Sequence, residues 1–180
     1  SECPVCGRKT SIHEENDVKV LVCENEECLA KKIKSISHFV SRDAMNIDGL
    51  SEATIEKLVA KGFLHGLAGL FNLEKYKDEI TQMEGFGKRS FEKLVQAAEN
   101  AKKTTTARFV YSLGIPNIGL SNAKMICKYM DNDFNKVRNA SPEELVEIDG
   151  IGEVIAEAFA SFFAKPENNK TIDELLKVIE

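Results

Sequence analysis

The sequence lacks tryptophan, long apolar runs and extended runs of β-branched residues. Its 180 residues contain ten phenylalanines and three tyrosines but no tryptophan. No apolar stretch approaches the roughly 20 residues of a membrane-spanning helix, and no signal peptide is recognisable. Leucine, alanine, lysine and glutamate recur instead at helical spacing. The sequence therefore predicts a mainly α-helical protein of an intracellular compartment, with one domain and a small module and no membrane partner.

The sequence also has little that would serve a catalytic centre. We find no Gly-rich nucleotide loop and no cluster of carboxylates that suggests one. The chain begins at Ser1, without a methionine, and continues directly into a cysteine motif. We interpret it as a piece of a longer protein.

Net charge alone argues against nucleic acid as a partner, because the chain carries −5. The charge is unevenly distributed, however. Residues 1–30 have three basic and seven acidic side chains, net −4; residues 31–108 have fourteen and ten, net +4; residues 109–180 have seven and twelve, net −5. The middle of the chain is therefore where we expect an anion to bind.

Four cysteines in two closely spaced pairs form the first motif: Cys3, Cys6, Cys23 and Cys28. A C-x2-C and a C-x4-C pair, brought together by a hairpin, supply four thiolates for tetrahedral Zn²⁺, and Gly7 relaxes the first turn. The strand-like stretch 18–22 leads into the second pair, as in a zinc ribbon. The pattern predicts a zinc-finger module over residues 1–30, with a structural metal and no open coordination position.

Other interpretations of the cysteines stay open. A disulfide pair or free thiols would also use them, although an odd cysteine count without a secretory signal disfavours disulfides. His13 and His38 are the nearby side chains that would replace a cysteine as ligand. Cys127 lies among apolar residues and is predicted to be a buried core thiol.

The stretch 83–90, Met-Glu-Gly-Phe-Gly-Lys-Arg-Ser, predicts a tight turn between two helices. Gly85 adopts a positive φ without a Cβ clash, and Gly87 allows a close approach of the backbone. The amides that follow begin a helix, where unpaired N–H groups and the helix dipole favour an anion. Lys88 and Arg89 lie beside these amides. Taken alone, the stretch would also fit an ordinary helical hairpin.

Three further stretches repeat this pattern. The turn positions are Gly49, Gly85, Asn117 and Gly150, in the stretches 47–53, 83–90, 115–123 and 148–155, at intervals of 36, 32 and 33 residues. Asparagine fits because it tolerates a positive φ better than most residues. A fixed period with a fixed apolar frame indicates a repeated supersecondary unit. We predict a domain of residues 31–180 with four helix-hairpin-helix motifs packed as two pairs, at about 40–103 and 107–160.

Each turn provides candidate DNA-binding residues: Gly49, Ser51, Gly85, Gly87, Lys88, Arg89, Asn117, Gly119, Ser121, Lys124, Gly150 and Gly152. Ser51 replaces the second glycine in the first turn and is predicted to cap the next helix. The second turn is expected to contribute most, because two cations directly follow its second glycine. The fourth turn has Glu153 there and is expected to serve packing or to bind through amides alone.

Several other segments have local signals. Residues 30–40, extended by Arg42, form a basic amphipathic segment, which is either a solvated helix face or a phosphate-facing flank. The residues 141–144, Ser-Pro-Glu-Glu, predict a capped helix start. Residues 165–169 predict a loop, and the capping box at 171–174 predicts the start of a last short helix.

A four-cysteine module followed by four helix-hairpin-helix motifs resembles the C-terminal half of bacterial NAD-dependent DNA ligases. The similar stretches are 3–7, the pair Cys23 and Cys28, Ala-Met-Asn-Ile-Asp-Gly-Leu at 44–50 and Leu-Gly-Ile at 113–115. The resemblance covers essentially the whole chain, and the order of the modules is its most specific part. It implies a cytoplasmic, nucleoid-associated bacterial protein of DNA replication and repair. It also implies that an adenylation domain and an OB fold precede this region and that a BRCT domain follows it.

The resemblance further implies that the chemistry lies outside this chain. The family takes AMP from NAD on a lysine in the pattern K-x-D-G. The near-matches at 46–49 and 147–150 lack that lysine, so no phosphoramidate can form on them. NAD and Mg²⁺ are thus expected only in the absent catalytic domain. The chain itself is expected to grip nicked double-stranded DNA from the minor-groove side without reading its sequence.

Two other functions fit the same sequence. Tandem helix-hairpin-helix pairs also occur in repair nucleases and junction-binding proteins, where some of them mediate subunit contacts. The acidic stretch 109–180 would suit a protein partner better than DNA. A purely structural helical domain is the third possibility.

Overall fold

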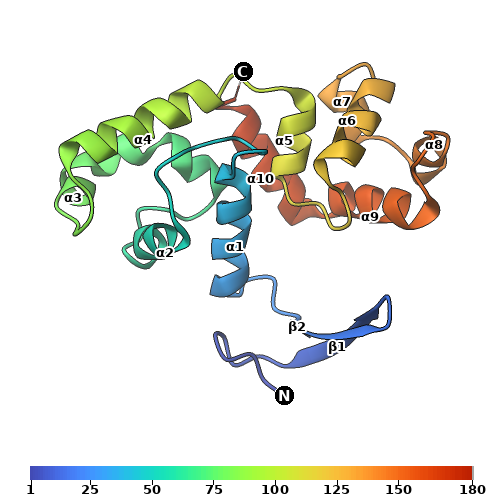
Figure 1. Cartoon of the computed structure of the whole chain (residues 1–180), viewed down its shortest axis with the longest axis horizontal. Helices are drawn as coiled ribbons and strands as arrows, with labels where there is room; N and C mark the ends of the chain where they lie inside the picture. The colour runs from blue at the N-terminus through green and yellow to red at the C-terminus, as the bar shows by residue number, and fades with distance from the viewer. Residues whose placement is uncertain (180) are drawn as a thin grey trace.

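The computed structural model, which describes residues 1–179, places a small two-stranded module beside a helical body (Figure 1). The strands are β1 (Thr10–Glu15) and β2 (Val18–Cys23). The helices are α1 (Leu29–Val40), α2 (Glu52–Ala60), α3 (Lys77–Thr81), α4 (Lys88–Ala101), α5 (Thr106–Ser112), α6 (Leu120–Tyr129), α7 (Phe134–Arg138), α8 (Pro142–Val146), α9 (Glu153–Ala164) and α10 (Pro166–Leu176), with the 3-10 helices η1 (Leu67–Phe71) and η2 (Leu73–Tyr76). The predicted mainly α-helical fold is confirmed. Within residues 1–179, no helix is both long and apolar enough to cross a membrane.

The strands β1 and β2 form an antiparallel hairpin in which Thr10 lies opposite Cys23. Asn16 and Asp17 both have positive φ at its tip, where such residues fit a two-residue turn. Apolar side chains remain exposed on both faces of the hairpin, including Ile12 and Val20. A two-stranded hairpin without its own core is marginal by itself. The stability of the β1–β2 hairpin therefore depends on contacts between the segments at its two ends.

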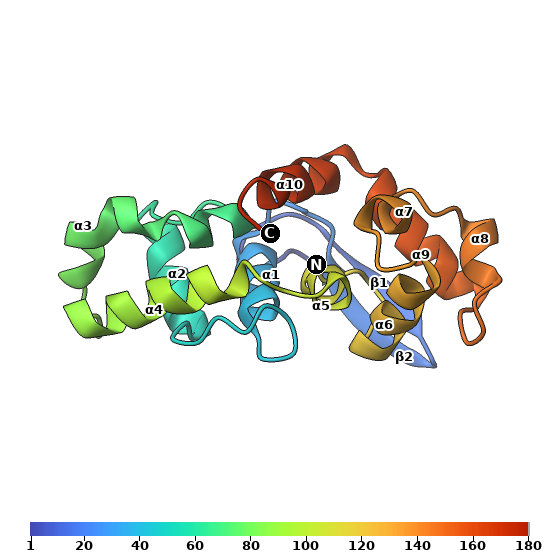
Figure 2. The ribbon, with the colours of Figure 1, turned by 90° about the horizontal axis from the view of Figure 1, so that it is seen from above.

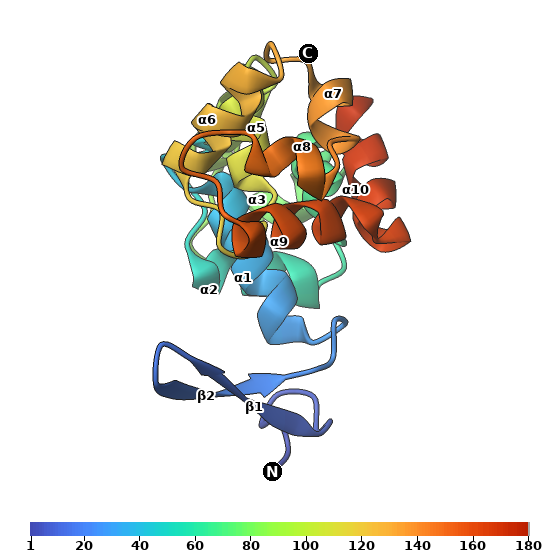
Figure 3. The same cartoon turned by 90° about the vertical axis from the view of Figure 1, so that its right-hand side faces the viewer.

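Helix α1 connects the hairpin module to the helical body (Figure 3). It begins directly after Cys28, so the basic segment predicted at 30–40 is a helix. Its apolar face buries Ile36, Phe39 and Val40 in the core. The module is thereby joined to the body through a regular helix rather than a loop.

The helical body has two halves, which Figure 2 shows side by side. The first half contains α2 to α4 and the two 3-10 helices, and the second contains α5 to α9. A single hydrophobic core runs through both, with Phe39, Phe91 and Phe159 fully buried. Helix α4 ends at Ala101, before the threonine run 104–106, and the Thr105 hydroxyl caps α5 by accepting from the Arg108 amide at 3.2 Å.

The expected loop at 165–169 and helix start at Thr171 are wrong. Helix α10 already begins at Pro166, which is pre-shaped for the first helical position. Thr171 lies inside the helix, and its hydroxyl donates to the Glu167 carbonyl at 3.2 Å. The side-chain amides of Asn168 and Asn169 donate to the carbonyls of Phe162 and Phe163 at the end of α9. These asparagines therefore cap the preceding helix from within the next one.

The capped helix start at 141–144 is confirmed. The Ser141 hydroxyl accepts from the Glu144 amide, and the Glu144 carboxylate accepts from the Ser141 amide, both at 3.2 Å. The short helices α7, η1 and η2 had no sequence signal that we recognised. They occupy only four or five residues each, too few for a hydrophobic period to show.

Candidate nucleic-acid interface and metal centre

Four turns share one backbone form. Their third residues have positive φ: 98° at Gly49, 84° at Gly85, 65° at Asn117 and 91° at Gly150. In the last three turns the next amide donates to the carbonyl three residues earlier: Phe86 to Met83 at 3.0 Å, Ile118 to Ile115 at 3.2 Å, and Ile151 to Ile148 at 3.0 Å. This hydrogen bond with a positive φ at the third position is the form of a type II turn. The positive φ expected from the sequence is therefore present at all four positions, and the type II hydrogen bond is present in the last three turns.

Apolar residues at both ends of each turn fix it to the core. The first residues, Ile47, Met83, Ile115 and Ile148, are all buried. The fourth residues, Leu50, Phe86, Ile118 and Ile151, are buried or half-buried against the same core. The second and third residues of each turn are exposed between them. This anchoring presents the start of the following helix to solvent.

The helices after the second, third and fourth turns begin without a side-chain cap. Their N-cap residues are Gly87, Gly119 and Gly152, in extended conformations. The first amides of each helix, for example those of Lys88, Arg89 and Ser90, have no acceptor within residues 1–179. The first turn differs, because the Ser51 hydroxyl accepts from the Thr54 amide at 3.2 Å, as predicted. Three of the four helix starts thus offer a full set of free N–H groups.

The four turns also differ in the charged residues at the start of the helix that follows each one. Helices α4 and α6 have no acidic residue in their first turn. Lys88 and Arg89 in the first turn of α4, and Lys124 at the fifth position of α6, are exposed and form no ion pair within the described residues. Helix α2 instead begins with Glu52, and α9 begins with Glu153, each of which repels an anion. The second and third turns are therefore the better anion sites.

The basic segment of α1 is partly neutralised. Lys31 lies 3.6 Å from the Glu26 carboxylate, and Lys34 lies 3.6 Å from that of Glu52. The Lys34 contact was not foreseeable, because its partner belongs to another helix. These pairs favour the solvated-face interpretation of the segment over the phosphate-facing one.

Three of the four turns lie visibly on one side of the molecule. In Figure 2 the loop before α2, the start of α4 and the loop before α9 lie toward the lower edge, whereas α10 runs along the upper edge. A single elongated partner could thus contact both halves.

The four N-terminal cysteines converge in space. All four Sγ atoms lie within 4.8 Å of one another, with Cys3 to Cys28 at 3.9 Å and Cys6 to Cys23 at 3.5 Å. A tetrahedral Zn²⁺ with Zn–S bonds of about 2.3 Å separates its sulfurs by about 3.8 Å. A disulfide would need about 2.05 Å, and all five cysteines are free thiols. The donor set fits a four-sulfur metal site.

Local backbone explains this convergence. Gly7 has φ 70°, and its amide donates to the Cys3 carbonyl at 2.8 Å, which closes the first knuckle as predicted. Cys28 is the N-cap of α1, and its carbonyl accepts from the Lys32 amide at 3.1 Å. The hairpin register then places Cys23 at the end of β2, beside the first knuckle.

A polar cluster beside Cys23 was missed by the sequence reasoning. The Glu24 carboxylate accepts from the Ser11 hydroxyl and pairs with His13 Nε2 at 2.9 Å. These hydrogen bonds hold the pKa of Glu24 below its usual range. The alternating polar residues on β1 are the sequence signal that could have indicated this cluster. The cluster ties the end of β2 to β1 next to the cysteines.

The histidines considered as alternative ligands bind elsewhere. His13 pairs with Glu24, and His38 Nε2 donates to the Tyr111 carbonyl at 2.7 Å. Neither belongs to the sulfur cluster.

The thiols differ in acidity. The Asn25 side chain lowers the pKa of Cys6 to about 6 by hydrogen bonding. At Cys23 the Asn25 amide acts in the same direction, but burial and the other thiols raise the pKa to about 11. Burial alone raises the pKa of Cys127 to about 12, as expected for an inert core thiol.

Serine substitutions at Gly85 and Gly87 test the turn geometry. A Cβ at either glycine meets no heavy atom within 4 Å, so only the backbone conformation distinguishes them. Gly85→Ser is expected to lower the free energy of unfolding by about 1–2 kcal/mol, because φ there is 84°. Gly87→Ser is expected to be neutral or slightly stabilising, because serine is a good N-cap. Urea denaturation measures both; equal losses would contradict the assigned turn.

Comparisons with known proteins agree with this geometry. Residues 41–100 match the family described as SAM-like helix-hairpin-helix tandem, and residues 108–172 match the family described as helix-hairpin-helix motif. Proteins named DNA ligase are 61% identical over 98% of the chain in Lachnoclostridium phytofermentans and 55% identical over 99% in Ruminiclostridium cellulolyticum. Another, from Halalkalibacterium halodurans, is 39% identical over 97%.

The chain spans about a quarter of the length of these relatives, 27% of the first two and 25% of the third. The similarity extends through the cysteine module as well as the helical body, because it covers nearly the whole chain. Nearly the whole chain is therefore similar to a segment of proteins named DNA ligase, and two of its regions match helix-hairpin-helix families.

Proposed function

We propose that this chain is the zinc and helix-hairpin-helix region of a bacterial NAD-dependent DNA ligase and that it holds nicked double-stranded DNA by the phosphate backbone. The complete ligase would seal nicks during replication and repair in the bacterial cytoplasm, at the nucleoid. The relatives named DNA ligase and the two matched helix-hairpin-helix regions support this proposal.

One observation carries the proposal. Two uncapped helix starts, at α4 and α6, combine free amides with exposed cations and no acidic residue in the first turn. Backbone N–H groups at a helix N-terminus bind phosphate oxygens, and the dipole adds to the attraction. Contacts of this kind position a duplex but do not read its bases. Binding is therefore sequence-tolerant and strongly dependent on salt.

The helical domain, residues 31–180, would contain four motifs arranged as two pairs. The constant turn form and the spacing of the four turns support that number, and each matched region encloses two of the turns. Among the candidate residues, those of the second and third turns would contribute most: Gly85, Gly87, Lys88, Arg89, Asn117, Gly119, Ser121 and Lys124. The first and fourth turns would add amide contacts or packing, through Gly49, Ser51, Gly150 and Gly152.

The module of residues 1–30 would hold one structural Zn²⁺ through its four cysteines. The metal would replace the hydrophobic core that the β1–β2 hairpin lacks, since its Ile12 and Val20 are exposed. Four sulfur ligands leave no position for substrate.

Catalysis would take place in other parts of the same polypeptide. The K-x-D-G lysine that accepts AMP is absent from this sequence. We assign NAD and Mg²⁺ to an adenylation domain, which would work with OB and BRCT domains of the same chain.

Fluorescence anisotropy with nicked and intact duplexes across a salt series tests the proposal. Binding is expected at low salt. The logarithm of the association constant is expected to fall linearly with the logarithm of the salt concentration, with a slope of about −0.9 for each phosphate contact. Duplexes of unrelated sequence are expected to bind equally well, and added NAD is expected to leave the chain free of AMP. No binding at low salt, or a strong preference for one sequence, contradicts the proposal.

A protein-interaction or junction-binding module of a repair protein is the second candidate. The acidic start of α9 and the net charge of −5 over residues 109–180 favour it. Dimerisation in gel filtration without any shift of a nicked duplex would support this candidate instead.

A further inference from the structure

The two best anion sites belong to different halves of the helical body. The second turn precedes α4 in the first half, and the third turn precedes α6 in the second half. A partner held at both sites benefits from a high effective concentration of the second contact once the first has formed, provided that the spacing is correct. The contacts that fix the two halves relative to each other therefore bear directly on binding.

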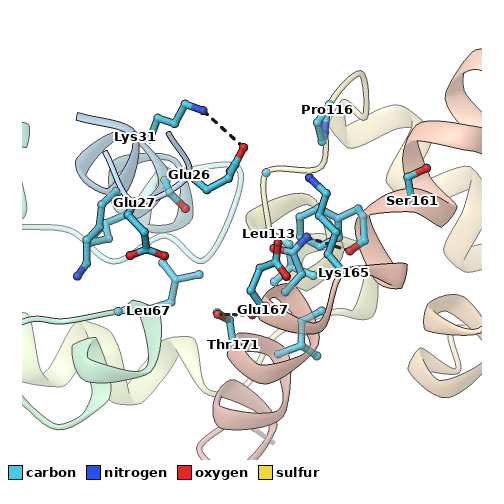
Figure 4. A pocket seen from close by; sticks show the side chains of 18 of the residues that line it. Glu26, Glu27, Lys31, Leu67, Leu113, Pro116, Ser161, Lys165, Glu167 and Thr171 are labelled. Atoms are coloured by element: carbon cyan, nitrogen blue, oxygen red, sulfur yellow. Dashed lines mark hydrogen bonds and ion pairs between the residues drawn. The ribbon is translucent and has the colours of Figure 1, made fainter. Parts of the chain in front are cut away.

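Helix α10 packs against both halves. It contacts η1 in the first half and α9 in the second, and its Ile172 and Leu175 are fully buried. Ile172 also lines a groove of about 680 Å³, together with Leu67 of η1 and Leu113 after α5. Figure 4 shows α10 between the segments that carry Leu67 and Leu113. The apolar contacts of α10 thus bridge the junction.

Polar contacts fix α10 to the second half. The Arg138 guanidinium of α7 donates to Asp173 at 3.0 Å and to Asn169 at 2.8 Å, with only 17% of its side chain exposed. Asn169 in turn donates to the Phe163 carbonyl at 2.6 Å. These contacts hold α10 to the second half at two positions, Asn169 near its start and Asp173 near its end.

A second contact joins α5 of the second half to α1, which itself packs against α2 of the first half. His38 Nε2 donates to the Tyr111 carbonyl at 2.7 Å, and the two rings pack edge to face with centroids 4.8 Å apart. The hydrogen bond links residues 73 positions apart in the sequence. Since α10 runs along the upper edge in Figure 2 and α5 lies below it, the junction is held at two separate places.

We propose that α10 and His38 are positioning elements for DNA binding: they hold the second and third turns at the spacing that lets both grip one duplex. This inference rests on the proposed function. Helix α10 lies on the edge of the molecule opposite the start of α4 and the loops before α2 and α9, so it acts without touching DNA (Figure 2). Loosening the junction leaves each turn intact but lowers the effective concentration of one turn for a duplex already bound to the other.

The experiment combines residual dipolar couplings with DNA binding, using the 180-residue chain with Leu67→Ala and Ile172→Ala. In the wild type both halves are expected to share one alignment tensor, and in the variant they are expected to give two. The variant's affinity for a nicked duplex is expected to fall about tenfold. The control combines Ile55→Ala and Leu145→Ala, which removes the same side-chain types from fully buried places in α2 and α8. It is expected to keep one tensor and an affinity within about twofold.

If the Leu67→Ala/Ile172→Ala variant does not fold, a milder variant still tests the proposal. His38→Phe keeps a ring but removes the N–H donor, and we expect about threefold weaker DNA binding. His38→Gln retains a donor and is expected to recover most of the affinity. Two tensors with unchanged affinity, or one tensor in the Leu67→Ala/Ile172→Ala variant, would overturn the positioning role. Failure of the wild type to bind any duplex would instead overturn the proposed function.

Discussion

Replacing Cys6 by serine is expected to abolish zinc binding and to unfold residues 1–28 while the helical body stays folded. A structural Zn²⁺ contributes on the order of 10–16 kcal/mol in small zinc modules, far more than an exposed two-stranded hairpin can supply. The helical body has its own continuous core and should not need the metal. Metal analysis by mass spectrometry and amide hydrogen exchange would show both effects.

Cys127→Ala is the matched control for this experiment. It removes a different thiol, which is fully buried in α6 and does not belong to the sulfur cluster. We expect it to retain one zinc per chain and to lower the stability of the helical body by roughly 1–2 kcal/mol, through the small cavity it creates. Retention of zinc by the Cys6→Ser chain would show that the four sulfurs are not the ligands.

Removing both cations of the second turn, with Lys88→Ala and Arg89→Ala, is expected to weaken DNA binding about 10- to 100-fold at low salt. The slope of log affinity against log salt should become shallower by about two, since each lost phosphate contact removes close to one released counterion. Both side chains are exposed, so the fold should not change. Anisotropy titrations over a salt series measure the slope and the affinity together.

The control for this loss of charge is Lys170→Ala with Lys177→Ala. Both lysines are exposed and lie on or directly after α10, on the edge opposite the turns. Their removal changes the net charge equally but should leave the salt slope unchanged. An identical effect of the two pairs would mean that only net charge matters, and the second turn would lose its assigned role.

The turns were predictable because their requirement is local. A positive φ at the third turn position needs glycine or asparagine, and Gly85 and Asn117 satisfy it in the structure. The cysteine cluster was predictable for the same reason, since its spacing encodes two knuckles. The start of the last helix was predicted wrongly because two local signals for a helix start lie close together. Pro166 and the capping box at Thr171 both mark helix starts, and the earlier one prevails because the asparagines after Pro166 cap α9.

Contacts between distant residues were not predictable. Glu52 pairs with Lys34 of α1, and this pairing, with the Ser51 cap, reduces what the first turn offers an anion. His38 was considered as a metal ligand because it follows the cysteine module, yet it donates to the Tyr111 carbonyl across the junction. Neither the charge of a residue nor its position in the sequence reveals its partner when that partner belongs to another helix.

Cys28 is at once the last sulfur of the cluster and the N-cap of α1. In mechanical terms, no flexible linker separates the cysteine module from the helical body. The module cannot rotate about α1 without pulling Cys28 out of the sulfur cluster or opening the first helical turn, where its carbonyl accepts from Lys32. A torque on the hairpin would thus pass into α1, and from His38 on α1 into the junction between the two halves.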